Sequence, residues 1–152
     1  MIKSFLIASV SSVLLVSSIY AEDVYVDNNT KLMWQDNKEA KATRKPWVNP
    51  DNYNDKNYNN TEGDTAASYC ENLNLKSFND WRLPSSEELV GIFKQNSKLN
   101  NVSHNNYWSS TSDTGMNNYR AWRIYFFSTG HSNFHNKNNN YNVRCVRTLT
   151  YK

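Results

Sequence analysis

The sequence predicts a single α+β domain, in which two short helices pack on a small, twisted antiparallel sheet with long loops. Residues 85–93 contain a helix start followed by apolar residues at helical spacing, and residues 119–127 alternate as a strand does. The chain is rich in Asn, whose side chains stabilise turns. Its five Trp, ten Tyr and six Phe residues supply enough apolar area for one core.

Residues 1–21 are typical of a secretory signal peptide. Lys3 precedes an apolar run over residues 5–19 that contains no acidic residue, and Ala21 provides a small residue for cleavage. The run is short for a membrane span and has no charged stop after it. We expect cleavage after Ala21, a single domain over residues 22–152, and a secreted or periplasmic protein without stable membrane insertion.

Composition and motifs argue against several classes of function. The formal net charge is +3, including Lys3, and this is too small to indicate a nucleic-acid partner. The sequence has no GxSxG, P-loop, HExxH or dinucleotide-binding motif. We therefore expect a protein that is not an enzyme, although the alternative stays open.

The two cysteines, Cys70 and Cys145, are expected to form one disulfide, because an exported chain meets an oxidising compartment. A reactive thiol is the alternative. The sequence has no CxxC spacing and no His next to either cysteine, so it does not support a reactive thiol.

The N-terminal half begins with an expected hairpin, residues 24–27 and 31–35 around a turn at 28–30. Residues 36–60 have no hydrophobic period and are expected to be a long loop. A helix is expected to follow, with Thr61 as its N-cap and its end near Asn74.

The centre of the chain contains the clearest local motif. Ser85 and Glu88 form a capping box, so that a helix should begin at Ser86. Trp81 should be buried ahead of it. We expect Asp80 to fix the turn and Arg82 to bridge to the sheet or to a carboxylate. An ion-binding or acid–base cluster of Asp80, Arg82, Glu87 and Glu88 is the alternative.

The C-terminal half reads as a succession of strands. Residues 107–111 place Trp108 inward, and residues 119–127 place Trp122 with Ile124 and Phe126 on one face. A turn at 128–130 returns the chain along 131–135, and 141–148 closes the sheet.

Two groups of residues are candidate metal sites, and an ordinary polar surface is the other interpretation of both. No cofactor is expected, with calcium as the alternative in the loop that offers oxygen ligands at Asp51, Asp55, Asn57, Asn59 and Asp64. This loop lacks the complete calcium-binding pattern. His131 and His135 share one side of their expected strand, which would allow zinc, whereas His104 lies apart.

The main candidate binding residues are expected on an exposed sheet face. Aromatic rings and fork-shaped guanidinium groups suit sugar hydroxyls, sulfates and carboxylates. The alternative is a polar sheet surface that binds nothing. The candidates are Tyr119, Arg120, Arg123, Tyr125, Lys137 and Tyr141.

Several motifs in order resemble the Lcl C-terminal domain family: residues 32–37 (LMWQDN), 67–70 (ASYC), 79–84 (NDWRLP), 88–89 (EL), 107–111 (YWSST), 121–122 (AW) and 143–147 (VRCVR). The resemblance implies a C-type lectin-like fold, also related to the formylglycine-generating enzyme, with a Cys70–Cys145 bridge typical of lectin-like domains. It further implies adhesion, through sulfated glycans or extracellular matrix.

The sequence departs from both relatives at their functional motifs. The calcium-dependent sugar-binding tripeptides of C-type lectins, Glu-Pro-Asn or Gln-Pro-Asp and Trp-Asn-Asp, are absent. The reactive cysteine pair of the formylglycine-generating enzyme would need the two cysteines assigned to the disulfide. We therefore expect an exported recognition or adhesion module with a glycan or an envelope or extracellular protein as partner. An enzyme and a structural or inhibitory envelope protein are the alternatives.

Overall fold

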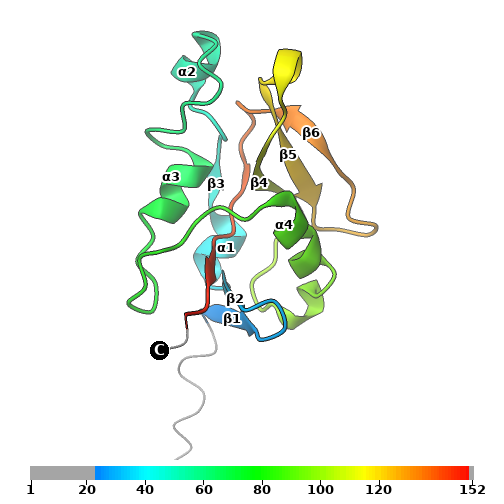
Figure 1. Ribbon diagram of the computed structural model, residues 1–152. Helices are drawn as coiled ribbons and strands as arrows, with labels where there is room; N and C mark the ends of the chain where they lie inside the picture. The colour runs from blue at the N-terminus through cyan, green and yellow to red at the C-terminus, as the bar shows by residue number, and fades with distance from the viewer. Residues whose placement is uncertain (1–22, 151–152) are drawn as a thin grey trace, which may run out of the picture.

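A computed structural model describes residues 23–150, and Figure 1 shows their arrangement. The fold is α+β, as predicted, with short helices beside two separate β-sheets. The expected signal peptide, residues 1–21, lies outside the described residues. Within residues 23–150, no helix combines the length and the apolar character that crossing a membrane requires.

The first sheet confirms the predicted N-terminal hairpin. β1 (Val24–Asp27) and β2 (Leu32–Gln35) pair antiparallel, and β8 (Val146–Thr148) pairs with the other side of β2. In the turn, Asp27 Oδ1 accepts the backbone N–H of Asn29 at 3.0 Å. The first and last strands of the described chain therefore flank the same central strand.

The second sheet has five strands in the order β3-β7-β4-β5-β6. The β4–β7 pair is parallel and the other pairs are antiparallel, so the predicted purely antiparallel sheet is wrong in this respect. The strands are β3 (Arg44–Lys45), β4 (Asn106–Ser112), β5 (Arg120–Tyr125), β6 (Ser132–Asn136) and β7 (Tyr141–Asn142).

The predicted closing strand over residues 141–148 is divided between the two sheets. β7 ends at Asn142 and β8 begins at Val146. Val143, Arg144 and Cys145 between them are fully buried. Their backbone bonds leave strand geometry: Val143 N–H donates to Thr43 O, and Cys145 N–H donates to the Gln35 side chain. Alternation of apolar and polar residues does not show that the chain passes from one sheet to the other.

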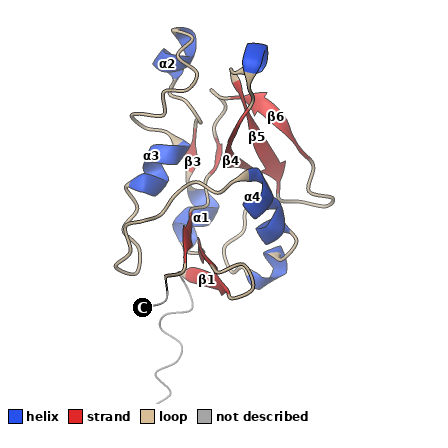
Figure 2. Ribbon diagram, in the orientation of Figure 1, coloured by secondary structure: helices blue, strands red, loops and turns tan. Residues whose placement is uncertain are grey.

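Residues 36–60 are not the structureless loop that was predicted. They contain the five-residue helices α1 (Lys38–Ala42) and α2 (Pro50–Asn54), and β3 lies between them. Asn37 caps α1 by accepting the N–H of Ala40 at 3.2 Å, and Asn49 caps α2 in the same way. These helices are too short to display a hydrophobic period. Figure 2 shows long loops around them.

The third helix, α3 (Ala66–Glu71), begins later and ends earlier than predicted. Its N-cap is Thr65 rather than Thr61, and Thr65 forms a reciprocal capping box with Ser68. Gly63 has a φ of +83°, which is incompatible with a helix through that position. Cys70, near the end of this helix, is fully buried.

The capping box of the fourth helix is confirmed. α4 (Ser86–Phe93) begins at the predicted residue, Ser85 Oγ accepts the N–H of Glu88, and Glu88 accepts the N–H of Ser85 at 2.8 Å. Arg82 forms a two-pronged ion pair with the same Glu88 carboxylate, at 2.7 and 2.8 Å. Two short 3₁₀ turns, Asn96–Lys98 and Gly115–Asn117, complete the described helices.

Two apolar clusters form the core, one on either side of the five-stranded sheet. The predicted Cys70–Cys145 disulfide is present, with the two Cα atoms 5.5 Å apart, and it lies within the first cluster. Trp81 and Trp108 are buried in that cluster as predicted. The second cluster lies beneath α4 and contains Trp34, Leu89, Ile92, Tyr107, Ile124 and Phe126, with Trp122 half-buried beside it.

Replacement of Gly130 by Ala is expected to destabilise the β5–β6 hairpin. Gly130 has a φ of +65°, and an added Cβ would lie 2.2 Å from Phe93 Cε1. We expect a loss of about 2 to 4 kcal/mol in the free energy of unfolding by urea denaturation, from strain and overpacking together. Gly115→Ala is the matched control, because Gly115 has a φ of +70° with open space around it. Equal losses in the two variants would contradict the contact with Phe93.

Candidate binding surface

The candidate surface is the half-buried part of one face of the five-stranded sheet, beside the first apolar cluster. Alternation along β5 places Ala121, Arg123 and Tyr125 on the same side, and the register pairs Trp108 with Arg123 and Ala121 with His135. We call the half-buried side chains of Arg123, Tyr125, His135 and Tyr141 the Arg123 face. Arg123 and Tyr125 belong to this face by alternation and Tyr141 by its contact with His135, whereas the other three predicted binding residues do not belong to it.

Arg123, His135 and Tyr141 form a hydrogen-bonded network. Arg123 Nη2 lies 3.1 Å from His135 Nε2, and His135 Nδ1 lies 2.6 Å from the Tyr141 hydroxyl. Arg123 Nη1 donates to the carbonyl oxygen of His131 at 2.9 Å. The centres of the His135 and Tyr141 rings are 5.7 Å apart, and Ala121, the register partner of His135, is fully buried. The network fixes the guanidinium in one orientation.

The electrostatics of this network disfavour a positive charge on its histidine. Burial, and then the positive charge of Arg123, lower the pKa of His135 below its usual value. Burial raises the pKa of the Tyr141 hydroxyl, against the opposite effect of the Arg123 charge. Arg123 therefore carries the positive charge of the network. Its Nε atom is buried without a hydrogen-bond partner among residues 23–150.

Tyr119 lies apart from the Arg123 face, in an aromatic row with two tyrosines from the α2 region. The Tyr58 ring is 5.2 Å from Tyr53 and 6.1 Å from Tyr119, in edge-to-face arrangements. Arg120 lies 5.8 Å from the Tyr119 ring centre and forms an ion pair with Asp113 at 2.7 Å. The structure thus divides the six predicted residues into two groups and a buried lysine.

Lys137 is the buried residue, contrary to its expected place on an exposed face. Its side chain has no exposed surface, and Nζ donates to Tyr58 O at 2.8 Å and to Asn59 Oδ1 at 3.1 Å. The same Nζ lies 4.1 Å from the centre of the Trp47 ring. Lys137 therefore fastens the α2 region to the sheet. No local sequence pattern indicates that this segment lies against Lys137.

Stability is expected to rise with pH through the titration of Lys137. Burial lowers the pKa of Lys137 from 10.5 to about 8, against a weaker opposing effect of Asp113. Between these two pKa values the unfolded chain holds a proton that the folded chain has released. The free energy of unfolding should therefore increase by about 1 to 3 kcal/mol over this range. Urea denaturation at several pH values should show the increase in the wild type and not in Lys137→Met. Parallel profiles would contradict it.

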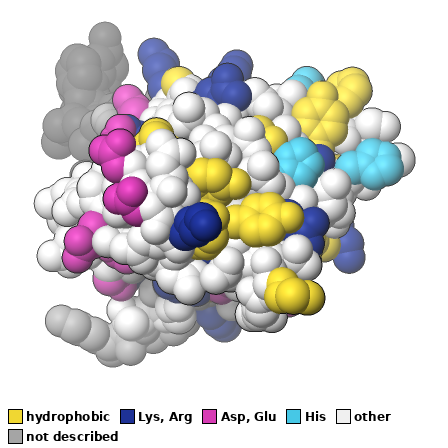
Figure 3. Space-filling model, turned by 90° about the horizontal axis from the view of Figure 1, so that it is seen from above, with side chains coloured by type: hydrophobic (Ala, Val, Ile, Leu, Met, Phe, Trp, Pro, Cys, Tyr) yellow, Lys and Arg dark blue, Asp and Glu magenta, His cyan; other side chains and the backbone are white. Residues whose placement is uncertain are grey.

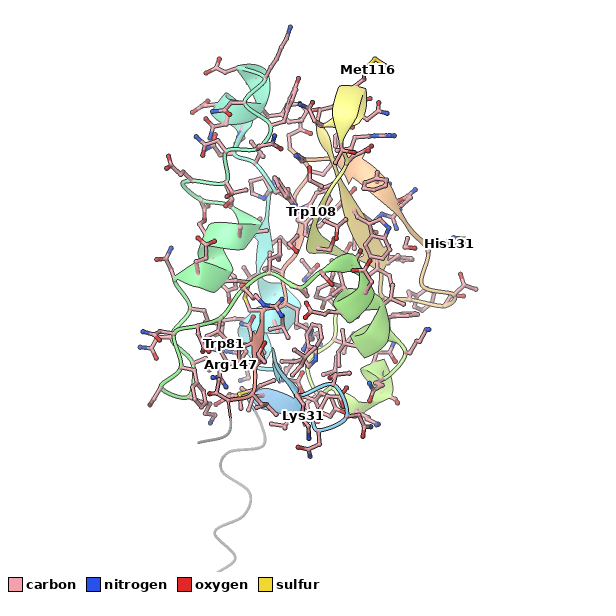
Figure 4. The ribbon with its side chains drawn as sticks, viewed as in Figure 1. Lys31, Trp81, Trp108, Met116, His131 and Arg147 are labelled. Carbon is pink, nitrogen blue, oxygen red and sulfur yellow. A yellow bond between two sulfur atoms is a disulfide. The ribbon has the colours of Figure 1, made fainter. Side chains whose placement is uncertain are left out.

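The predicted calcium ligands do not come together as a group of acids. Asp64 pairs with Lys45, and Asn59 is engaged by Lys137. Asp51 lies in the first turn of α2. Among residues 23–150, no group of three or more His, Cys, Asp or Glu side chains has an arrangement that could hold a metal ion. Of the histidines weighed for zinc, His135 bonds Arg123 and Tyr141, whereas His131 is exposed at the outer edge of the molecule (Figure 4).

The structure contains two separate ion pairs where the alternative prediction was one ion-binding or acid–base cluster of Asp80, Arg82, Glu87 and Glu88. Arg82 binds Glu88, as described above. Asp80 binds Arg147 through two contacts of 2.6 and 3.0 Å, so Asp80 is tied to β8 rather than only to its own turn. The Arg147 guanidinium also lies 3.7 Å from the centre of the Phe78 ring, and Figure 4 shows it near Trp81. These contacts attach the segment before α4 to the first sheet.

Charged side chains are unevenly distributed over the upper surface of the molecule. Figure 3 shows hydrophobic, basic and histidine side chains over the centre and right of the upper surface, whereas acidic side chains gather at its left. Phe127, half-exposed, adds an aromatic ring 6.0 Å from Tyr125 and 5.2 Å from His104. Sequence reasoning missed Phe127 and the role of His135. The Arg123 face thus combines a fixed cation with aromatic surface.

Comparison with protein families gives one match. The Lcl C-terminal domain family matches residues 23–147, which is most of the chain. Comparison with curated proteins gives no match.

Proposed function

This chain belongs to the Lcl C-terminal domain family, and we propose that it is an exported recognition module that binds anionic glycans through the Arg123 face. The fixed guanidinium of Arg123 carries this proposal. A guanidinium held in one orientation matches the paired oxygens of a sulfate or carboxylate, and the neighbouring aromatic rings offer apolar faces for a sugar. His135 and Tyr141 act as positioning residues for the cation.

The C-type lectin-like fold and the cellular location of the protein are further parts of this proposal. We infer a C-type lectin-like architecture, supported by the family match, by the long loops and by a disulfide that links a helix to the last strand region. We infer a secreted or periplasmic location from the character of residues 1–21 and from the disulfide, which is typical of oxidising compartments. The glycan would then be met in the envelope or outside the cell.

We propose a binding protein rather than an enzyme of the formylglycine-generating type because of the state of the two cysteines. Chemistry of the formylglycine-generating type uses a reactive cysteine pair, and both cysteines of this sequence are joined in the structural disulfide. Cys70 and Cys145 are both fully buried. A binding role accounts for the Arg123 face without any reactive thiol.

Replacement of Arg123 by Ala is expected to weaken binding of heparin, used as a sulfated probe, by about 10- to 100-fold, because charge-assisted hydrogen bonds are lost. Arg123→Lys should recover part of the affinity, since it keeps the charge and loses the fork. Isothermal titration calorimetry at fixed ionic strength measures both.

The matched control is Lys98→Ala, because Lys98 is an exposed cation in the 3₁₀ turn Asn96–Lys98, outside the Arg123 face. Its loss should change affinity less than twofold, and desulfated heparin should bind weakly to the wild type and to each variant. Equal weakening by Lys98→Ala and Arg123→Ala would indicate attraction by general charge. Undiminished binding by Arg123→Ala would remove the proposed site.

A further inference from the structure

A second concave site lies away from the Arg123 face, between the β1–β2 hairpin and α4. Its volume is about 430 Å³, within the size range of small-ligand sites. Leu32, Trp34 and Ile92 are apolar, nearly fully buried lining residues. The hairpin is held toward the end of α4 by Gln95, whose side-chain amide donates to Asp27 Oδ2 at 3.0 Å. The pocket is therefore built on ordered elements.

Gly91 keeps the helical wall of this pocket open. It occupies the interior of α4, where Gly is less favourable than Ala, and its φ is not in the left-handed region. A Cβ added at Gly91 would meet no heavy atom within 4 Å. Neither backbone conformation nor close packing requires Gly at this position. The missing side chain leaves space on the pocket side of α4.

The polar groups of the pocket are acidic. Its lining includes Asp27, Glu87 and Glu88 and, among the described lining residues, no Lys or Arg. Arg82 pairs with Glu88 from outside the lining, so that the surplus negative charge comes from Asp27 and Glu87.

Both of these carboxylates are ionised at neutral pH. Burial acts to raise the pKa of Asp27, but hydrogen bonds from Gln95, Thr30 and Asn29 outweigh it and hold this pKa below its usual value. Hydrogen bonds from its own backbone N–H and from Ser85 lower the pKa of Glu87.

We propose that this pocket binds a small organic cation with an apolar body. The apolar body would rest on Leu32, Trp34 and Ile92, in the space beside Gly91. The cationic group would lie near the exposed Glu87 carboxylate, and the buried Asp27 carboxylate of the lining would add to the negative potential there. An anionic ligand is disfavoured there by charge, which makes this site opposite in preference to the Arg123 face and independent of the glycan proposal.

Phenylbutylammonium is a suitable probe, with phenylbutanol and phenylbutanoate as neutral and anionic analogues of similar shape. NMR titration of the exported protein should show saturable shifts of the Trp34 indole signal with the cation. Affinity for phenylbutanol should be about tenfold lower, and phenylbutanoate should bind still more weakly. Equal binding of the three probes, or no binding of the cation up to about 10 mM, would overturn the proposal.

Two variants locate the site. Gly91→Leu should fill the pocket and weaken the cation at least about tenfold, without lowering Tm, since Leu is a better helix former than Gly. Glu87→Gln should weaken the cation about threefold and leave phenylbutanol unchanged. Glu71→Gln, an exposed acid on α3, is the charge control and should have no effect. Wild-type affinity in Gly91→Leu would show that the cation binds elsewhere.

Discussion

Replacement of Asp36 by Ala is expected to lower the free energy of unfolding by about 3 to 5 kcal/mol, because it leaves a buried cation without its counter-ion. Asp36 and Arg144 are both fully buried, and Asp36 Oδ1 lies 3.2 Å from Arg144 Nη1. The same carboxylate accepts the backbone N–H groups of Asn100 and Asn101, at 2.7 and 3.0 Å. Its loss therefore also removes the acceptor of two part-buried backbone N–H groups.

Urea denaturation followed by fluorescence measures this loss, and two other variants define its origin. Asp64→Ala removes a carboxylate from an exposed ion pair with Lys45 and should cost less than about 1 kcal/mol. Asp36→Ala combined with Arg144→Met should be more stable than Asp36→Ala alone, since the unpaired charge is gone. A double variant less stable than the single one would contradict the buried-charge explanation.

Replacement of both Cys70 and Cys145 by Ala is expected to cost about 4 kcal/mol or more. The disulfide closes a loop with a sequence separation of 75 residues, which restricts the unfolded chain. Both sulfur atoms are also in the core, where truncation removes packing contacts. We expect a large fall in Tm for the double variant.

Reduction gives an independent measure of the same effect. Wild-type protein unfolded in the presence of a thiol reductant should lose stability similar to that of the double variant, apart from the packing of the sulfur atoms. Mass spectrometry after alkylation without reduction should find no free thiol on the purified native protein. Two alkylated cysteines in native protein would contradict the disulfide.

Local signals in the sequence were sufficient for some elements and insufficient for others. The start of α4 was predictable because Ser85 and Glu88 satisfy the first turn within three residues of each other. The N-terminal hairpin was predictable from alternation. α1 and α2 were missed because five residues are too few to show a period, although Asn37 and Asn49 offered capping signals.

Long-range contacts explain the remaining differences. Alternation placed Arg123 and Tyr125 on one side of β5, but it could not show that a segment near Tyr58, 79 residues before Lys137, would bury that lysine. The Asp36–Arg144 pair, separated by 108 positions, likewise leaves no local pattern. His135 was predictable as a strand residue, but its role as a support for Arg123 depends on the tertiary approach of Tyr141.

The placement of β1 and β8 on either side of β2 bears on how the domain can be presented. Adjacent strands lie about 5 Å apart, so the two outer strands of this sheet are separated by about 10 Å. Figure 1 shows this sheet at the end of the molecule opposite α2 and the tip of the β4–β5 connection. If the domain were tethered or fused to a neighbour at either strand, this sheet would lie next to the point of attachment. α2 and the β4–β5 connection would then point away from that attachment.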